Sequence, residues 1–122
     1  MRTDLEMGKG KMCVQAGHAS ILALQYTKGI RDIGGDRLGD IRDKWLEEGQ
    51  FKVVLKCPVQ ETHDGAYELQ IWVEKARKAE LPVVEVRDFG KTQVEPNTLT
   101  CIAIGPALSE NVDKVTGNLP LL

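Results

Sequence analysis

Long apolar runs are missing from this 122-residue chain, and none approaches the roughly 20 residues that cross a bilayer. The first residues, Met1 to Glu6, lack the apolar core of a secretion signal, and their acidic residues argue against a transit peptide. These absences predict a protein with no membrane role and a cytoplasmic location. They leave association with an organelle open.

Cysteine and histidine are scarce. The three cysteines, Cys13, Cys57 and Cys101, are widely spaced and odd in number, which favours reduced thiols over a disulfide framework. The two histidines, His18 and His63, belong to no ligand-spaced cluster such as H-E-x-x-H. The sequence therefore predicts no metal site.

Two signatures of catalysis are also absent. There is no G-x-S-x-G elbow for a Ser-His-Asp hydrolase and no G-x-x-x-x-G-K-[ST] loop for nucleotide hydrolysis. A net charge of -2 gives no overall attraction to nucleic acid. Any contact with RNA has to come from a local group of cations such as Lys9 and Lys11.

The remaining composition, 42% hydrophobic and 28% charged, is that of a globular domain, and without repeats or linkers residues 1–122 form one predicted unit. Apolar periodicity predicts helices over residues 11–28, around Leu38 to Gly49, from a start between Thr62 and Ala66, and at 109–115 with Ser109 as cap and Gly117 as end. Strands are predicted at 51–57, 82–87 and 98–104, the last two antiparallel. This order predicts a mixed sheet with helices on both faces, and it leaves only Met1 to Leu5 for another strand.

The first candidate site is the segment Met7 to Lys11, at the start of the first predicted helix. Its two glycines let the backbone approach a ligand, and N–H groups at a helix start favour an anion such as phosphate. Lys11, Gln15 and His18 fall on one helical face, so an ammonium, an amide and an imidazole can project together. Taken alone, a solvated basic turn and a core histidine are the commoner explanations.

The second candidate site is the segment Asp88 to Gln93, directly after the strand predicted at 82–87. It offers a carboxylate, a hydroxyl and an amide at a strand end, where α/β folds hold ligands. Turn chemistry explains these residues at least as well on local grounds, because Asp often starts a turn and Gly supplies a positive φ.

Four blocks of sequence point to a family. They are R-T-D-L-E-M-G-K-G-K-M-C-V-Q-A-G-H-A, K-V-V-L-K, D-F-G-K-T-Q-V-E-P-N-T and D-K-V-T-G-N-L-P-L-L. In order and spacing they resemble the archaeal and eukaryotic type of peptidyl-tRNA hydrolase, from about Arg2 to the C-terminus. The resemblance implies an α/β fold with a mixed, mainly parallel four-stranded sheet, whose first strand is short or missing here. It implies hydrolysis of the ester between peptide and tRNA, no cofactor and, often, a homodimer.

The resemblance also implies the site. Asp88 orients or deprotonates water, Lys9 offsets negative charge on the tetrahedral intermediate or the terminal phosphate, and Thr92 holds the geometry. His18 is an alternative base, because its ordinary pKa lies nearer neutral pH. The substrate-binding residues are expected to be Lys11, Gln15, Gly8, Gly10, Lys91 and Gln93.

Two other functions stay open. The same fold can bind tRNA or another anionic partner without turnover, and Cys13 can serve a thiol-based enzyme. The hydrolytic interpretation requires that the glycine-lysine turn and the acid-hydroxyl turn near residue 90 meet across a shared cleft.

Overall fold

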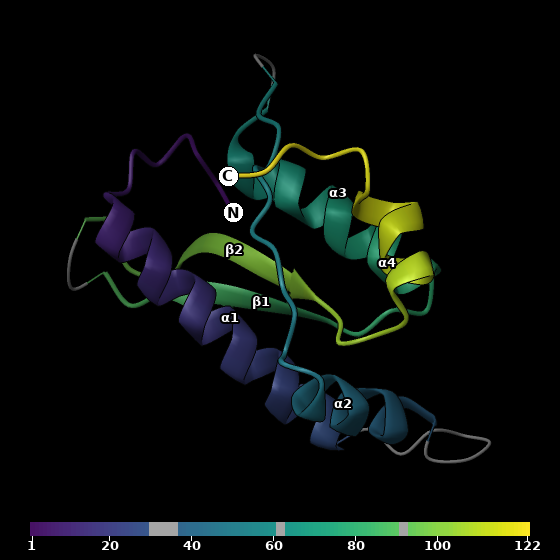
Figure 1. The fold of residues 1–122 in the computed structure, drawn as a ribbon. Helices are drawn as coiled ribbons and strands as arrows, with labels where there is room; N and C mark the ends of the chain where they lie inside the picture. Colours follow the sequence, from purple (N-terminus) through teal and green to yellow (C-terminus); the bar gives the residue numbers. More distant parts are fainter. Residues whose placement is uncertain (30–36, 61–62, 91–92) are drawn as a thin grey trace.

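The computed structural model describes residues 1–29, 37–60, 63–90 and 93–122. In these ranges lie the helices α1 (Lys9–Gly29), α2 (Arg37–Glu47), α3 (Gly65–Lys78) and α4 (Ser109–Thr116) and the strands β1 (Val83–Asp88) and β2 (Thr98–Ile104). Helix α1 crosses one face of the strand pair, whereas α3 lies on the other face with α4 beside it (Figure 1). Helices therefore cover both faces, as predicted.

The helix predictions are confirmed, with differences at the ends. Helix α1 begins at Lys9, two residues before the predicted start at 11, so the second glycine of the basic turn is already helical. Helix α3 begins at Gly65 because the Asp64 side chain accepts a hydrogen bond from the Tyr67 N–H. The predicted cap at Ser109 is wrong: Leu108 occupies the cap position of α4 without a side-chain bond, because Ser109 is already helical. Residues 30–36 of the predicted loop lie outside the described residues.

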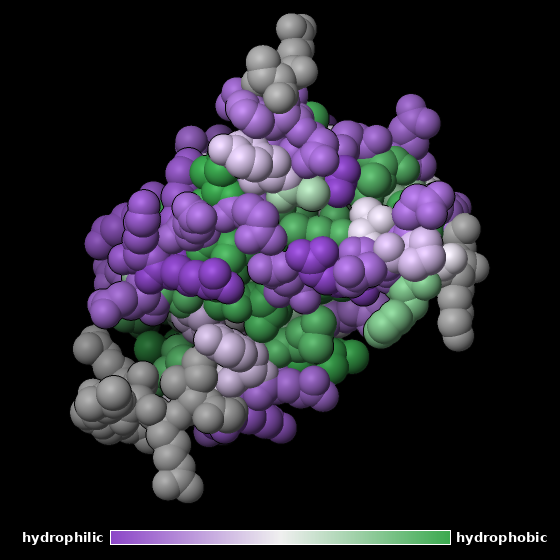
Figure 2. All heavy atoms as spheres, turned by 180° about the vertical axis from the view of Figure 1, so that it is seen from behind, coloured by the Kyte–Doolittle hydropathy of each residue, from purple (hydrophilic) through white to green (hydrophobic). Residues whose placement is uncertain are grey.

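Strands β1 and β2 pair antiparallel, as predicted. Their two faces support separate apolar clusters. On the α1 side, Val86 and Cys101 pack with Ala19, whereas on the α3 side Leu99 packs with Leu69, Trp72 and Cys57. Seen from behind, the molecule has a mostly hydrophilic rim with apolar side chains gathered near its middle (Figure 2). The strand pair thus divides the core into two clusters.

The predicted four-stranded, mainly parallel sheet is not confirmed, because the described residues form a two-stranded antiparallel sheet. The prediction of a strand at 51–57 is wrong: this segment contributes one isolated β-bridge, between Leu55 and Leu121. Met1 and Arg2 lie between this segment and β2: the Met1 amine donates to the Leu55 carbonyl and the Arg2 N–H to the Thr100 carbonyl. The Cys57 N–H also donates to the Met1 carbonyl, but two residues are too few to form a continuous ladder.

A cavity of about 340 Å³ is lined by parts of residues 51–57 and of β2 and by small side chains of α1. The small side chains include Ala16, Ala19 and Ala23. Past Arg2, no strand of the described residues pairs with the free edge of β2. The two chain termini lie next to each other beside this cavity (Figure 1). Both are held by the segment 51–57, since the Met1 amine donates to the Leu55 carbonyl and the Leu122 N–H donates to the Val54 carbonyl.

Leu69→Ala is expected to lower the free energy of unfolding by about 2–5 kcal/mol, because it removes a buried side chain and leaves a cavity. Leu69 is 2% exposed and packs within the α3-side cluster. Urea denaturation followed by circular dichroism measures the change. Glu74→Ala, at an exposed position of the same helix, is the control and should change the value by less than about 0.5 kcal/mol. Equal effects of the two substitutions would contradict the assignment of Leu69 to the core.

Candidate active site

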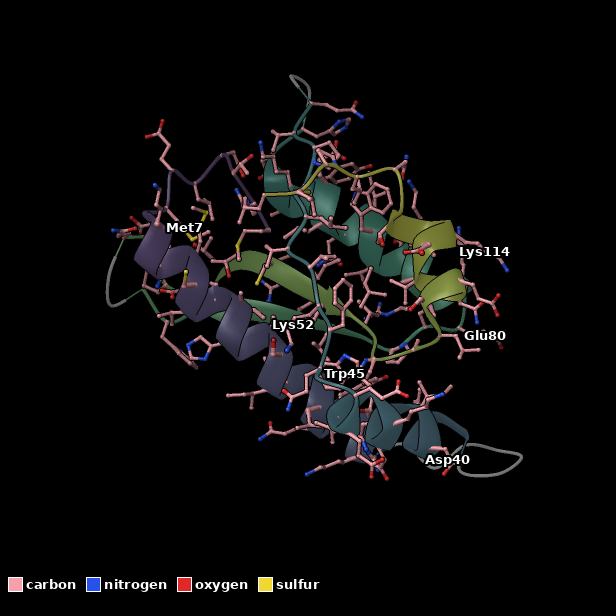
Figure 3. All side chains as sticks on the ribbon, in the orientation of Figure 1. Met7, Asp40, Trp45, Lys52, Glu80 and Lys114 are labelled. Carbon is pink, nitrogen blue, oxygen red and sulfur yellow. The ribbon has the colours of Figure 1, made fainter. Side chains whose placement is uncertain are left out.

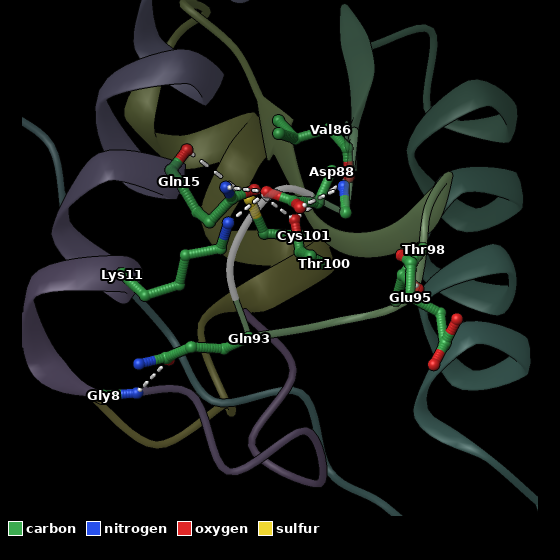
Figure 4. Close-up of polar contacts among 11 residues, drawn as sticks. Gly8, Lys11, Gln15, Val86, Asp88, Gln93, Glu95, Thr98, Thr100 and Cys101 are labelled. Carbon is green, nitrogen blue, oxygen red and sulfur yellow. Dashed lines mark hydrogen bonds and ion pairs between the residues drawn. The ribbon is translucent and has the colours of Figure 1, made fainter.

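The structure brings the glycine-lysine segment and the segment after β1 into direct contact. The Lys11 ammonium, in the first turns of α1, forms an ion pair with the Asp88 carboxylate, and each side chain is only 10% exposed. At a second point the Gly8 N–H donates to the Gln93 Oε1 at 2.9 Å (Figure 4). Two segments about 80 residues apart along the chain therefore form one site.

A tight turn holds Asp88 at the end of β1. Gly90 has a φ of 73°, and a Cβ added there would lie 2.5 Å from the Pro96 nitrogen, so glycine is required. The Gly90 N–H donates to the Asp88 Oδ1 at 2.7 Å, and the Asn97 N–H donates to the Asp88 carbonyl at 2.6 Å. The turn chemistry expected from the sequence is thus present, and it orients the carboxylate as well as the backbone.

The electrostatics of the site keep Asp88 ionised. Its Oδ2 accepts hydrogen bonds from the Lys11 ammonium and, at 3.1 Å, from the Gln15 amide (Figure 4). The Lys11 ammonium, followed by the Gly90 N–H, holds the pKa of the Asp88 carboxyl below its ordinary value. Asp88 is therefore a carboxylate at neutral pH, and this favours orienting water over strong proton abstraction.

Gln15 lies behind Asp88, in the protein interior. The side chain is 1% exposed, and its amide bridges Asp88 and Thr100: Nε2 donates to Asp88 and Oε1 accepts from the Thr100 hydroxyl. The sequence predicts that Gln15 binds the substrate, and in the structure its described side-chain contacts are with Asp88 and Thr100. Thr100 was not among the site residues predicted from the sequence, because a threonine within a β-rich run does not indicate a buried polar network.

The other predicted site residues are not joined to Asp88 by any hydrogen bond or ion pair among the described residues. Lys9 and His18 are exposed on α1, and within the described ranges neither side chain has a hydrogen bond or ion pair. A Cβ added at Gly10 would meet nothing within 4 Å, so the space beside the first turn of α1 is open. Lys91 and Thr92 lie outside the described residues.

The three thiols differ in accessibility. Cys13 is exposed, whereas Cys57 and Cys101 are buried, and burial raises the pKa of both buried thiols. The part of the chain that the structure describes has no group of three or more His, Cys, Asp or Glu side chains placed to hold a metal ion. No described helix is both long and apolar enough to cross a membrane.

Comparison with known proteins relates this site to a family. The family model for peptidyl-tRNA hydrolase PTH2 matches residues 1–122. A peptidyl-tRNA hydrolase of Sulfurisphaera tokodaii is 46% identical over 123 residues, covering 100% of this chain and 93% of that protein. Peptidyl-tRNA hydrolases of Methanocaldococcus jannaschii and Methanopyrus kandleri are 45% and 43% identical over 100% of this chain and cover 95% and 93% of those proteins.

The fold and the lysine-carboxylate pair define an α/β domain with a site suited to hydrolysis. The chain belongs to the peptidyl-tRNA hydrolase PTH2 family.

Proposed function

We propose that the chain hydrolyses the ester bond between peptide and tRNA in peptidyl-tRNA, with Lys11 and Asp88 at the reacting centre. Membership of the PTH2 family supports the reaction. The single structural observation that carries the assignment is the ion pair between Lys11 of α1 and Asp88 of β1. A carboxylate next to an ammonium supplies the two things that ester hydrolysis needs, a group that holds water and a charge that stabilises an oxyanion.

Asp88 orients the attacking water. An ionised carboxylate has about four acceptor positions. In the described residues two side chains occupy Oδ2, whereas Oδ1 accepts from the Gly90 N–H, so one position on Oδ1 can accept from water. The depressed pKa makes Asp88 a weak base, so it takes the proton from water only as the water oxygen bonds to the ester carbon. The proton then goes to the ribose oxygen as the ester C–O bond breaks. No covalent intermediate is required.

Lys11 offsets the negative charge that develops on the tetrahedral intermediate. Its ammonium is held at Asp88 and therefore next to the water that Asp88 orients. Positive charge in a site that is largely closed to solvent stabilises an oxyanion far more than the same charge in water. This assignment places at Lys11 the catalytic role that sequence reasoning gave to Lys9.

The remaining residues bind the tRNA end. Lys9 is the exposed first residue of α1, where a lysine and the free N–H groups of the helix start can together contact the terminal phosphate. Lys91 and Thr92 follow Gly90 in the sequence, and we assign to Thr92 the support of the reacting geometry and to Lys91 a contact with the substrate. Gln93 and Gly8 hold the two segments together through their mutual hydrogen bond.

The protein works in the cytoplasm and assembles as a homodimer. Exposed apolar side chains on α1 support the second statement: Val14, Ile21 and Tyr26 are 54%, 58% and 47% exposed. A second copy of the chain would remove this apolar surface from water.

The chain is expected to release free tRNA from a labelled N-blocked aminoacyl-tRNA. The purified chain is incubated with this substrate, and the free tRNA is separated from the ester at intervals. A gel shift on the same substrate measures binding independently. Binding with no release of tRNA at any enzyme concentration would sink the hydrolytic function and favour a module that only binds tRNA.

A further inference from the structure

A β-bulge lies in β2 next to the reacting centre. Val86 pairs with Cys101 and Arg87 pairs with Leu99, so Thr100 is the extra residue between two rungs of the ladder. Bulges re-aim side chains and are over-represented beside active sites. Thr100 is 0% exposed, so its hydroxyl needs a partner inside the protein.

The bulge turns Thr100 toward α1. On a regular strand consecutive side chains point to opposite faces. Here Thr100 and Cys101 both contact Gln15 of α1, through the Thr100 hydroxyl to the Gln15 Oε1 and through the Cys101 Sγ to the Gln15 carbonyl at 3.7 Å. The preceding residue, Leu99, packs on the α3 side. The irregularity in register therefore places the threonine hydroxyl against the glutamine amide.

The charge on Asp88 sets the orientation of the Gln15 amide. Ionised Asp88 accepts and does not donate, so Gln15 has to present its Nε2 to the carboxylate. The Gln15 Oε1 then faces Thr100, whose hydroxyl donates to it at 2.5 Å and also lies 3.2 Å from a second acceptor, the Val86 carbonyl (Figure 4). Since Gln15 is only 1% exposed, water has little access to replace a missing donor.

We propose that Thr100 is a positioning residue for peptidyl-tRNA hydrolysis: its hydroxyl fixes the orientation of the Gln15 amide, which in turn donates to the Asp88 carboxylate and keeps it aimed at the attacking water. This inference rests on the proposed function. Thr100 acts through Gln15 and does not contact the substrate.

Removing the hydroxyl changes what Asp88 faces. In Thr100→Val, the Gln15 Oε1 loses its donor, and the amide turns over to satisfy the oxygen elsewhere. Asp88 then loses the Nε2 donor and meets an oxygen, which favours its protonated form. In the described residues the groups that lower the pKa of Asp88 are Lys11, the Gly90 N–H and Gln15, so loss of the Gln15 bond raises the pKa while the first two keep it from rising far.

The expected result is an upward shift of about one pH unit in the titration of Asp88, since one hydrogen bond of ordinary strength is lost. The titration is followed by carbon NMR of the full chain labelled at aspartate carboxyl groups, and Asp88 is assigned as the signal absent from Asp88→Asn. Activity requires ionised Asp88, so the acidic limb of the pH–rate profile moves upward by the same amount. At neutral pH kcat falls about tenfold through misorientation, while KM stays unchanged.

Thr100→Ser is the control, because it keeps the hydroxyl and should titrate like the original chain. Should Thr100→Val fail to fold, Thr100→Ala is compared with Thr100→Ser, since these two differ by one hydroxyl. An Asp88 titration that is the same in a folded variant with and without the hydroxyl overturns the proposal. The NMR titration needs no substrate, so it tests the link between Thr100 and Asp88 even if the chain proves unable to hydrolyse peptidyl-tRNA.

Discussion

Asp88→Asn is expected to lower kcat for peptidyl-tRNA hydrolysis by about 10²- to 10⁴-fold, with little change in KM. The amide keeps the size of the carboxylate but loses its charge and part of its capacity to accept hydrogen bonds. Lys11 and Gln15 both donate to the Oδ2 of Asp88, and an amide nitrogen at that position would repel both donors. Single-turnover cleavage of an N-blocked aminoacyl-tRNA measures the effect on the chemical step.

The same assay decides between Asp88 and His18 as the group that handles the attacking water. His18 is exposed on α1, so His18→Ala should leave single-turnover cleavage within about threefold of the original rate if it serves only binding. Asp113→Asn, at an exposed position of α4, controls for the loss of one carboxylate charge. Near-normal cleavage by Asp88→Asn, together with loss of cleavage in His18→Ala, would transfer the role to His18.

Lys11→Met is expected to lower kcat by about 10²- to 10³-fold, the range seen when one group that stabilises an oxyanion is removed. The ammonium of Lys11 is the main cause of the lowered pKa of Asp88, so its loss also raises that pKa. Activity present above the pKa of Asp88 is then lost at a higher pH than in the original chain. The measurement is kcat as a function of pH, with circular dichroism to verify the fold.

Lys9→Met is the matched comparison for Lys11→Met, because the two lysines belong to the same basic segment. Lys9 is exposed, and its loss should raise KM and weaken the salt dependence of tRNA binding while kcat changes little. Lys114→Met is a control for net charge, since Lys114 lies on α4, far from Met7 and the basic segment (Figure 3). A larger fall in kcat for Lys9→Met than for Lys11→Met would return the catalytic role to Lys9.

Much of the local structure follows from short-range patterns. The apolar period of 3.6 predicted α1 and α3, and the β-branched run at 98–104 predicted β2 with both of its ends. The segment 51–57 shows the limit of this reasoning. Its residues favour an extended chain, but a strand forms only when a neighbour supplies a continuous ladder. Met1 makes two backbone hydrogen bonds to this segment, and Pro120 and Leu122 make one each.

The candidate site was likewise predicted only in part from the sequence. The sequence named Asp88, Lys11 and Gln15, because their chemical types and their positions at a strand end and on one helix face can be read from the chain. It gave the catalytic role to Lys9 and substrate binding to Lys11, although both lysines fit an anion-binding turn equally well. That choice depends on where the first turn of α1 faces once the helix has packed on the strand pair.

The sequence by itself determined the family, the helices, the paired strands and the types of side chain available for chemistry, because these depend on local periodicity and on motifs. The tertiary structure decided which lysine meets the carboxylate, that Gln15 lies in the interior, and that Thr100 joins it through a bulge. These relations join side chains 73 to 85 positions apart. Long-range packing sets them, and no local pattern along the chain encodes the distance between two such groups.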